Sequence, residues 1–226
     1  MLNVSIVLYN PNWQEVSNLT ATLLQSKYVD HIYWIDNSPT SSCPQSIDTR
    51  VIYQHSQHNI GYGAAHNIAI RESIYDNVPY HLVINPDIIL NAKELEQMLQ
   101  FISSHPEVGS LMPKVVYPNG ELQYLCKLLP TPFDVFGRRF LPHQWMEHRN
   151  HTYEMRASGY NKLMNVPYLS GCFMLLRTQA VQQARLFDER FFMYPEDMDL
   201  TRRIHRDYLT VFFPHEERRA EVPTSP

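Results

Sequence analysis

Four short apolar runs, rich in β-branched and aromatic residues, recur in the first half of the chain. They are Val4–Tyr9, His31–Asp36, Arg50–Gln54 and His81–Asn85. Their apolar positions are nearly continuous rather than alternating with polar ones, which is typical of strands covered on both faces. The pattern therefore predicts four buried strands.

Segments of helical periodicity lie between and after these runs, at Trp13–Ser26, Gly61–Asp76 and Ala92–Ser103. Strands and helices that alternate at this spacing favour an α/β fold, with a mostly parallel central sheet flanked by helices. The elements predicted for the first half of the chain thus suffice for one such sheet.

The second half of the chain is less regular. Val108–Tyr117 and Tyr168–Leu176 are predicted to be strands, whereas residues 119–165 mix proline, aromatic and basic residues without a sustained period. Variable loops of this kind commonly carry the parts of a site that adapt to a substrate. We expect one domain over residues 1–214, followed by an irregular tail over residues 215–226.

Composition narrows the class of protein. The 226 residues include 44% hydrophobic and 19% charged residues, as in ordinary globular domains. A net charge of −4 provides no global basic field, so nucleic acid is not an expected partner. Three scattered cysteines suit neither a disulfide framework nor a zinc site and favour a reducing cytoplasm. With no signal peptide or long apolar segment, we expect a cytoplasmic protein whose membrane contact is at most peripheral.

Polar residues interrupt the chain where three of the predicted strands stop, at Tyr9, at Asp36 and at Asn85-Pro86-Asp87. In open parallel sheets, ligands bind beside the carboxyl ends of the strands. Asp36 could accept hydrogen bonds from a base or ribose, and Asp87 could hold a hard cation that completes its shell with phosphate oxygens. The alternative, equally open for either acid, is that it caps the following turn or helix.

A second acidic group stands in "FFMYPEDMDLTRRI". Pro195 suits the first position of a helix, which places Glu196 and Asp197 in the first turn, where the helix dipole favours carboxylates. An ionised carboxylate exposed at a helix start can act as a general base. The alternative is again a capping role.

Other candidate residues carry weaker signals. Asp199 is expected to pair with Arg202 or Arg203 at helical spacing. The stretch "NIGYGAAHNIA" lacks the third glycine of a dinucleotide fingerprint, but it indicates a loop entering a helix whose free amides could face an anion. His55 and His58 are interpreted as solvated side chains and Cys172 as a small packed residue.

Six stretches, taken in order, resemble the family-2 glycosyltransferases of the GT-A fold, and most closely their rhamnosyltransferase-like members. They are "VSIVLYN", "WIDNS", "NIGYGAAHN", "VINPD", "LSGCFMLLR" and "FDERFFMYPEDMDLTRR". The resemblance spans roughly residues 3–214. It implies that residues 1–118, approximately, bind a nucleotide-sugar donor and that residues 119–214 form the acceptor and catalytic part.

The resemblance also implies roles for residues on the donor side. Asp87 matches the last acid of the family's Asp-x-Asp element, which coordinates Mg²⁺ or Mn²⁺ on the donor diphosphate. Asp36, with Tyr9 beside it, matches the acid near the base and ribose. The full set of donor-binding residues implied is Tyr9, Asp36, Gly61, Asn67 and Asn85.

On the acceptor side, Asp197 matches the catalytic base of the family. In an inverting transfer this base takes the proton of the acceptor hydroxyl while that oxygen attacks the anomeric carbon. Glu196 is expected to orient Asp197 or to bind the acceptor. Gly171 is expected to line the acceptor site, where side-chain bulk is not tolerated.

The Asn-Pro-Asp form of the metal element is associated with relatives that use dTDP-L-rhamnose and extend lipid-linked O-antigen intermediates at the cytoplasmic face of the inner membrane. Residues 127–142, "KLLPTPFDVFGRRFLP", interleave basic and aromatic residues and are interpreted as an acceptor loop, with contact to the membrane surface as the alternative.

The end of the chain departs from the family, which usually continues with another strand, a histidine close to the donor phosphates and further helices. This favours one alternative, a truncated nucleotide-sugar-binding remnant without activity. A second alternative is a sugar nucleotidyltransferase, but the glycine-rich, basic phosphate loop of that class is absent from "YNPNWQE".

Overall fold

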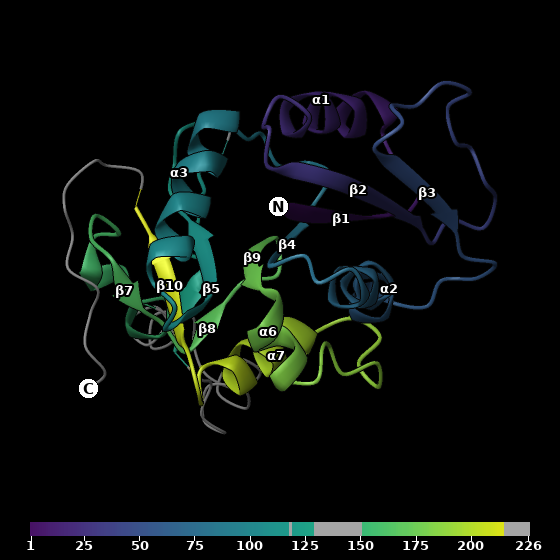
Figure 1. Cartoon of the computed structure of the whole chain (residues 1–226). Coiled ribbons are helices and arrows are strands. Elements are labelled where there is room, and N and C mark those ends of the chain that lie inside the picture. The colour runs from purple at the N-terminus through teal and green to yellow at the C-terminus, as the bar shows by residue number, and fades with distance from the viewer. Residues whose placement is uncertain (118, 129–150, 215–226) are drawn as a thin grey trace, which may run out of the picture.

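The computed structural model describes residues 1–117, 119–128 and 151–214. Within these ranges, an eight-stranded sheet in the order β3-β2-β1-β4-β9-β5-β10-β7 runs through the molecule (Figure 1). A separate two-stranded sheet joins β6 (Cys126–Lys127) to β8 (Tyr168–Leu169). The strands of the large sheet are β1 (Leu2–Leu8), β2 (Val29–Asp36), β3 (Val51–His55), β4 (Tyr80–Ile84), β5 (Val108–Pro113), β7 (Met164–Asn165), β9 (Phe173–Arg177) and β10 (Leu209–Phe213).

Most neighbours in the large sheet are parallel. β1 pairs in parallel with both β2 and β4, β2 with β3, and β5 with β10. β9 is antiparallel to its neighbours β4 and β5, and β7 is antiparallel to β10 at one edge. The predicted α/β fold with a mostly parallel central sheet is therefore confirmed, and its strands come from both halves of the chain.

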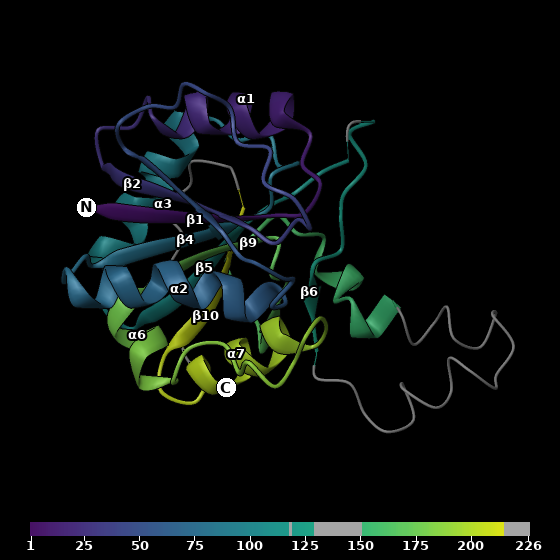
Figure 2. The ribbon, with the colours of Figure 1, turned by 90° about the vertical axis from the view of Figure 1, so that its right-hand side faces the viewer.

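Helices cover both faces of the sheet. α1 (Trp13–Leu23) and α3 (Ala92–Ser104) lie on one face, and α2 (Tyr62–Tyr75), α6 (Thr178–Gln183) and α7 (Glu196–Ile204) lie on the other (Figure 2). The sequence of β9 is a continuous apolar run because both faces of the strand are buried. Phe173 and Leu175 join the core beneath α1 and α3, whereas Met174 and Leu176 join the core beneath α6 and α7. A short 3-10 helix spans Arg156–Ser158.

Several predicted boundaries are wrong in detail. β1 ends at Leu8, so Tyr9 lies in the following bend, and β5 ends at Pro113. The run predicted as one strand over Tyr168–Leu176 is two strands with a turn between them, because the Gly171 N–H is directed to a side chain of α7 rather than to a neighbouring strand. Most of the predicted acceptor loop, from residue 129 onward, and the tail over residues 215–226 lie outside the described residues.

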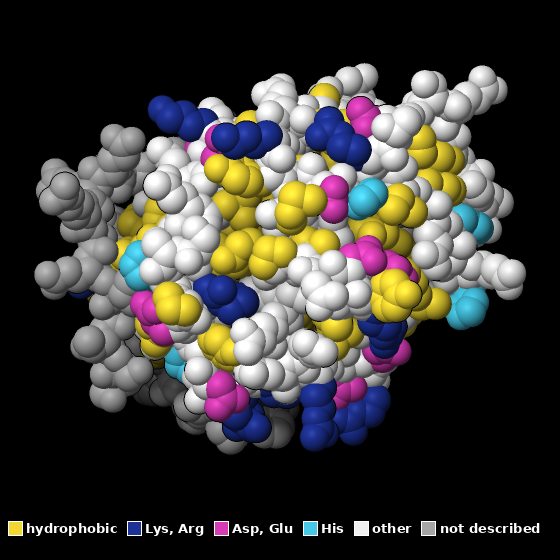
Figure 3. Space-filling model, in the orientation of Figure 1, with side chains coloured by type: hydrophobic (Ala, Val, Ile, Leu, Met, Phe, Trp, Pro, Cys, Tyr) yellow, Lys and Arg dark blue, Asp and Glu magenta, His cyan; other side chains and the backbone are white. Residues whose placement is uncertain are grey.

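The described surface carries no long hydrophobic helix and no concentrated basic field on the face shown. None of the helices in the described ranges is both long and apolar enough to cross a membrane. In the view of Figure 3, acidic and basic side chains are interspersed with hydrophobic and uncharged ones.

Buried polar side chains connect β1, β4 and α2 through the core. The Ser5 Oγ lies 2.6 Å from His66 Nδ1 and 2.8 Å from His81 Nε2. His81 Nδ1 lies 2.7 Å from Ser73 Oγ, to which the Asn3 amide donates at 3.1 Å. Burial lowers the pKa of His81 to about 3 and that of His66 well below its ordinary value. Both rings are therefore neutral at pH 7.

Acidification is expected to destabilise the fold through these two histidines. In the unfolded chain a histidine takes up a proton below about pH 6.5, whereas the buried rings stay neutral, so the unfolded state binds more protons. This contribution to stability is full above about pH 6.5 and is lost as the pH falls toward the folded pKa of about 3. For His81 alone the loss at pH 4.5 is about 2–3 kcal/mol.

Urea unfolding at pH 7.0 and pH 4.5 measures this effect. The His81→Gln variant should show a smaller difference in unfolding free energy between the two pH values than the wild type. The exposed His58 serves as the control, because His58→Gln should leave that difference unchanged. An undiminished difference in His81→Gln would show that His81 does not titrate as its burial predicts.

Candidate functional site

The carboxyl ends of β1 and β2 meet at one edge of the sheet. Leu8 pairs with Asp36, and the Asn37 N–H donates to the Leu8 carbonyl oxygen at 2.8 Å. The Asn10 N–H donates to Ser38 Oγ at 2.7 Å, which joins the two segments that follow these strands. Tyr9, with 55% of its surface exposed, therefore stands beside the end of β2, as the sequence predicts.

Asp36 is completely buried at this edge. Its Oδ1 accepts from the Ser38 N–H at 2.9 Å and its Oδ2 from the Tyr53 hydroxyl at 2.7 Å. Burial, with the hydrogen bond to Asp36 and the charge of Asp36, raises the pKa of Tyr53 to about 12, so the hydroxyl stays a donor. Asp36 thus fixes the segment after β2, and its predicted contact with a nucleoside stays a prediction.

The turn after β4 carries the predicted metal ligand. β4 ends at Ile84, and the Asn85 N–H donates to the Cys172 carbonyl oxygen at 3.0 Å, while the Asn85 Oδ1 lies 3.1 Å from the Tyr62 hydroxyl. Asp87 is exposed and has no hydrogen-bond or ion-pair partner among the described residues. The turn therefore holds Asn85 in place and leaves the Asp87 carboxylate free for a ligand.

Among the described residues, no group of three His, Cys, Asp or Glu side chains is close enough together to hold a metal ion. His55 and His58 accordingly do not form part of such a group. Mg²⁺ commonly needs only one or two carboxylates when substrate phosphates complete its shell. An exposed, unpaired Asp87 fits that mode of binding, in which the cation arrives with a diphosphate.

Gly61 stands immediately before α2 with φ +89°, a conformation that L side chains rarely adopt. A Cβ at this position would lie 2.5 Å from the Phe192 carbonyl oxygen, the same oxygen that accepts from the Tyr62 N–H at 3.1 Å. The predicted loop entering a helix is confirmed. The expectation of free amides is wrong for Gly61 and Tyr62, because the Gly61 N–H donates to Asn59 Oδ1.

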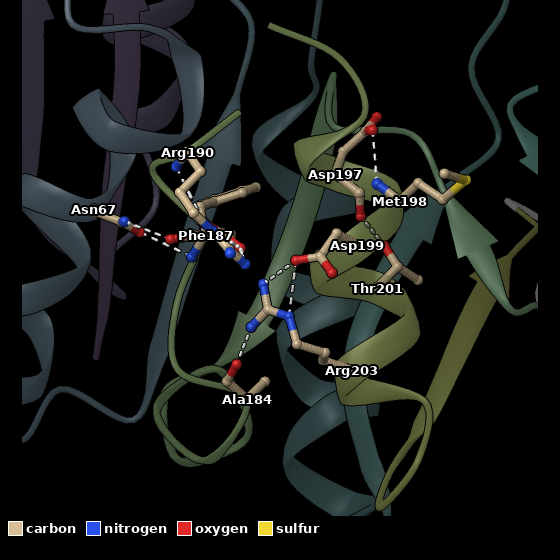
Figure 4. Close-up of polar contacts among 10 residues, drawn as sticks. Asn67, Ala184, Phe187, Arg190, Asp197, Met198, Asp199, Thr201 and Arg203 are labelled. Carbon is tan, nitrogen blue, oxygen red and sulfur yellow. Dashed lines mark hydrogen bonds and ion pairs between the residues drawn. The ribbon is translucent and has the colours of Figure 1, made fainter. Parts of the chain in front are cut away.

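Asn67 is buried and holds the segment between α6 and α7. Its amide nitrogen donates to the Phe187 carbonyl oxygen at 2.9 Å, and its Oδ1 accepts from the Phe187 N–H at 3.0 Å (Figure 4). The same amide nitrogen donates to Glu189 Oε1 at 2.9 Å. These bonds occupy the amide within the protein. Asn67 therefore positions the chain that leads into α7, and its predicted role in donor binding stays a prediction.

Asp197 lies in the first turn of α7, against the turn between β8 and β9. Its Oδ2 accepts from the Gly171 N–H at 2.8 Å, its Oδ1 accepts from the Met198 N–H at 2.7 Å, and the Tyr168 hydroxyl lies 3.3 Å from both oxygens. The expectation of an exposed acid is wrong, because these donors pack around the carboxylate and leave only 9% of the residue exposed. The arrangement fixes the carboxylate in one orientation.

Gly171 lies close to Asp197, as the prediction of a crowded site requires. A Cβ at Gly171 would lie 3.0 Å from the Asp197 Cβ and 3.3 Å from its Oδ2. The first of these distances is at the lower limit for carbon atoms that are not bonded. A side chain here would therefore displace the carboxylate.

Glu196 is the first residue of α7, and Pro195 precedes the helix rather than occupying its first position. Glu196 is buried, and its Oε2 has no hydrogen-bond partner within the described part of the chain. Burial, followed by the charge of Asp197, raises the pKa of Glu196 above its ordinary value. The two adjacent carboxylates thus differ in environment. Both oxygens of Asp197 accept hydrogen bonds, whereas Glu196 Oε2 is buried without a partner among the described residues.

Asp199, two residues further along α7, belongs to a different set of contacts (Figure 4). Its Oδ2 accepts from Arg203 Nε at 2.8 Å, and Arg203 also donates to the Ala184 carbonyl oxygen. The predicted ion pair at helical spacing is confirmed for Arg203. Asp199 therefore anchors α7 to the end of α6 and is separate from the acids of the site.

Cys172 shows that the two predicted halves of the site are close to each other. Burial, and then the charges of Asp87 and Asp197, raise the pKa of the Cys172 thiol to about 11. The thiol is therefore protonated at pH 7 and is a poor nucleophile. The Cys172 side chain, in the turn before β9, is therefore influenced by the charges of both Asp87, the predicted metal ligand, and Asp197, the predicted base.

Sequence reasoning did not single out Tyr62, Tyr168 or Tyr53, although their hydroxyls contact the site. Each stands beside a stretch that was noted: Tyr62 follows Gly61, Tyr168 precedes "LSGC", and Tyr53 lies on the strand next to Asp36. A tyrosine with an apolar ring and a polar tip is suited to the boundary between core and site. Tyrosines next to the candidate motifs could therefore have been predicted to contact the site.

Comparison with known proteins identifies the family. The model of the family described as "Glycosyl transferase family 2" matches residues 4–184. The chain is 27% identical over 231 residues to the N-acetylglucosaminyl-diphospho-decaprenol L-rhamnosyltransferase of Mycobacterium tuberculosis, and the alignment covers 96% of this chain and 75% of that protein.

Solved structures share the fold at low identity. S. aureus TarS has a TM-score of 0.61 and 14% identity over 95% of this chain. GalNAc-T7, solved with UDP, GalNAc and Mn²⁺, has a TM-score of 0.64 and 12% identity over 94% of this chain. The chain spans 58% of the TarS chain and 42% of the GalNAc-T7 chain. These likenesses show the fold.

Proposed function

Because the chain belongs to glycosyl transferase family 2, we propose that it is an inverting transferase that moves L-rhamnose from dTDP-L-rhamnose to a lipid-linked glycan. The observation that carries the proposal is the carboxylate of Asp197, oriented by the Gly171 N–H and the Tyr168 hydroxyl beside the turn that follows β4. A fixed acid near a candidate metal ligand suits transfer from a nucleotide sugar.

On the donor side, Asp87 supplies the carboxylate that binds Mg²⁺ or Mn²⁺ together with the diphosphate. Its exposure and lack of an internal partner among the described residues support this role. When bound, the cation neutralises the charge of the departing nucleoside diphosphate. Asn85, Tyr9, Asp36 and Gly61 shape the surrounding donor site, in keeping with their positions at strand ends and at the start of α2.

On the acceptor side, Asp197 accepts the proton of the attacking hydroxyl. The acceptor oxygen then forms its bond to the anomeric carbon as the bond to the diphosphate breaks, and the diphosphate leaves with the electron pair. Gly171, where a side chain would displace this carboxylate, lines the acceptor site. Glu196, adjacent to Asp197 at the start of α7, helps to orient that carboxylate or contacts the acceptor.

The relative supports a proposal for the acceptor. That protein is described as acting on N-acetylglucosaminyl-diphospho-decaprenol. We therefore assign a sugar carried on a polyprenyl diphosphate as acceptor, in the synthesis of a cell-surface polysaccharide such as an O-antigen, with the protein peripheral on the cytoplasmic face of the inner membrane. A rhamnose donor rests on the same relative.

Calorimetric titration tests the donor assignment. Purified protein is titrated with dTDP-rhamnose and with UDP-glucose, each with Mg²⁺ and with EDTA. Binding of dTDP-rhamnose that requires the cation and exceeds that of UDP-glucose is expected. A folded protein that binds neither nucleotide sugar would contradict the proposal and favour a remnant without activity, and a preference for UDP-glucose would overturn the rhamnose assignment.

A further inference from the structure

Tyr62 connects two turns that are far apart in the sequence. Its hydroxyl donates to the Gly171 carbonyl oxygen at 2.7 Å and lies 3.1 Å from Asn85 Oδ1. Asn85 belongs to the turn that carries Asp87. Gly171 belongs to the turn whose N–H donates to Asp197 at 2.8 Å. One hydroxyl thus contacts both turns: the turn after β4 carries Asp87, and the turn between β8 and β9 donates to the Asp197 carboxylate of α7.

The rest of Tyr62 is fixed by other elements. Its backbone N–H donates to the Phe192 carbonyl oxygen at 3.1 Å, in the segment that leads into α7. Its ring packs edge-on against His66 at 4.4 Å and against Phe187 at 6.4 Å between ring centroids. These contacts leave the side chain little freedom, so the hydroxyl is a fixed point from which the two turns are held.

The hydroxyl is suited to this role because it remains protonated. Burial, followed by the charges of neighbouring acidic groups, raises the pKa of Tyr62 well above its ordinary value. The neighbouring groups that contribute are Cys172, Asp197, Glu196 and Asp87. Tyr62 is therefore a hydrogen-bond donor throughout the pH range in which the acids are ionised.

We propose that Tyr62 is a positioning residue that sets the turn carrying Asp87 in register with the turn whose Gly171 N–H holds the Asp197 carboxylate. The inference rests on the proposed function for the roles of Asp87 and Asp197. The junction itself is defined by the contacts of Tyr62 with Asn85 and Gly171. Loss of the hydroxyl should loosen both turns together, because each loses its contact with the same atom.

Amide hydrogen exchange tests the junction without any assumption about substrate. In Tyr62→Phe, the amides of Asn85 and Gly171 should exchange about tenfold faster than in the wild type, because each turn loses its contact with the shared Tyr62 hydroxyl. Amides in the middle of β1 should not change. Unaltered exchange at Asn85 and Gly171 would overturn the proposal even if the enzyme is fully active.

Steady-state kinetics test the functional consequence. Because both acids are displaced relative to each other, kcat of Tyr62→Phe should fall about tenfold while KM for the donor changes less than threefold. The rate is expressed per folded enzyme, with the folded fraction measured by circular dichroism. A loss of stability alone would lower the folded fraction and leave kcat per folded enzyme unchanged.

Tyr160 provides the matched control. Its hydroxyl is also buried and donates to backbone carbonyl oxygens, those of Cys126 at 3.0 Å and Glu154 at 2.7 Å, but it contacts neither turn. Tyr160→Phe should lower the unfolding free energy without faster exchange at Asn85 and Gly171.

If the wild type shows no transfer but Tyr62→Phe shows faster exchange at Asn85 and Gly171, the proposed function fails and the junction stands. Equal exchange changes in the two variants would contradict a specific junction.

Discussion

The Asp197→Asn variant is expected to lose sugar transfer by about a thousandfold while it binds the nucleotide-sugar donor as tightly as the wild type. The amide has nearly the shape of the carboxylate but cannot take the proton of the attacking hydroxyl. Only Oδ1 of an asparagine can accept from the Gly171 N–H, which now meets either that oxygen or a repelling NH₂ group. The loss should therefore appear in kcat, and the donor titration should be unchanged.

Asp199→Asn is the control, because Asp199 lies on the same helix and pairs with Arg203 rather than with the site. It should retain transfer at close to the wild-type rate, with a small loss of stability of about 1 kcal/mol or less, as expected for a partly exposed ion pair. Initial rates of nucleoside diphosphate release give the comparison. Substantial transfer by folded Asp197→Asn would remove Asp197 as the base.

The Asp87→Asn variant should bind the donor at least tenfold more weakly in the presence of Mg²⁺, and about as weakly as the wild type binds it in EDTA. An amide oxygen carries no full negative charge, so the cation loses its one protein carboxylate. Asp87 is exposed and unpaired among the described residues, so stability should change by less than about 0.5 kcal/mol.

The same titration of Asp207→Asn separates this effect from a general change in charge. Asp207 is exposed beyond the C-terminal end of α7, and its removal changes the net charge equally. The control should bind the donor like the wild type. Wild-type affinity of Asp87→Asn in Mg²⁺ would place the metal elsewhere.

The fold could be predicted from sequence because its strands are buried on both faces. Continuous apolar runs such as the one ending at Ile84 identify strands in the core, and the helices between them impose parallel pairing. The antiparallel position of β9 between β4 and β5 could not be read in this way. The composition of one strand does not determine which other strands it pairs with.

The candidate site was predictable in its acids and not in their surroundings. Asp87 and Asp197 were identified because acids interrupt apolar runs or begin a helix. The burial of Asp197 depends on the Gly171 N–H and the Tyr168 hydroxyl, which are separated from it by 26 and 29 positions. Contacts over such distances form only when the chain folds, so sequence suggested an exposed acid.

The role of Asn67 illustrates the same limit. Its motif indicated a residue at the donor site, but its amide holds Phe187 and Glu189, which lie 120 and 122 positions later. A buried asparagine must place both its donors and its acceptor, and the residues that satisfy them can be far away in sequence. The fold thereby explains a polar residue that the pattern could only associate with a loop.

A transfer assay with a defined acceptor tests the proposed activity. Purified protein is incubated with Mg²⁺, dTDP-rhamnose and an N-acetylglucosamine linked through diphosphate to a short polyprenyl chain, and the product is examined by NMR. We expect a rhamnosylated lipid whose new linkage has the anomeric configuration opposite to that of the donor. Retention of the donor configuration, or no product from a protein that binds the donor, would contradict the proposal.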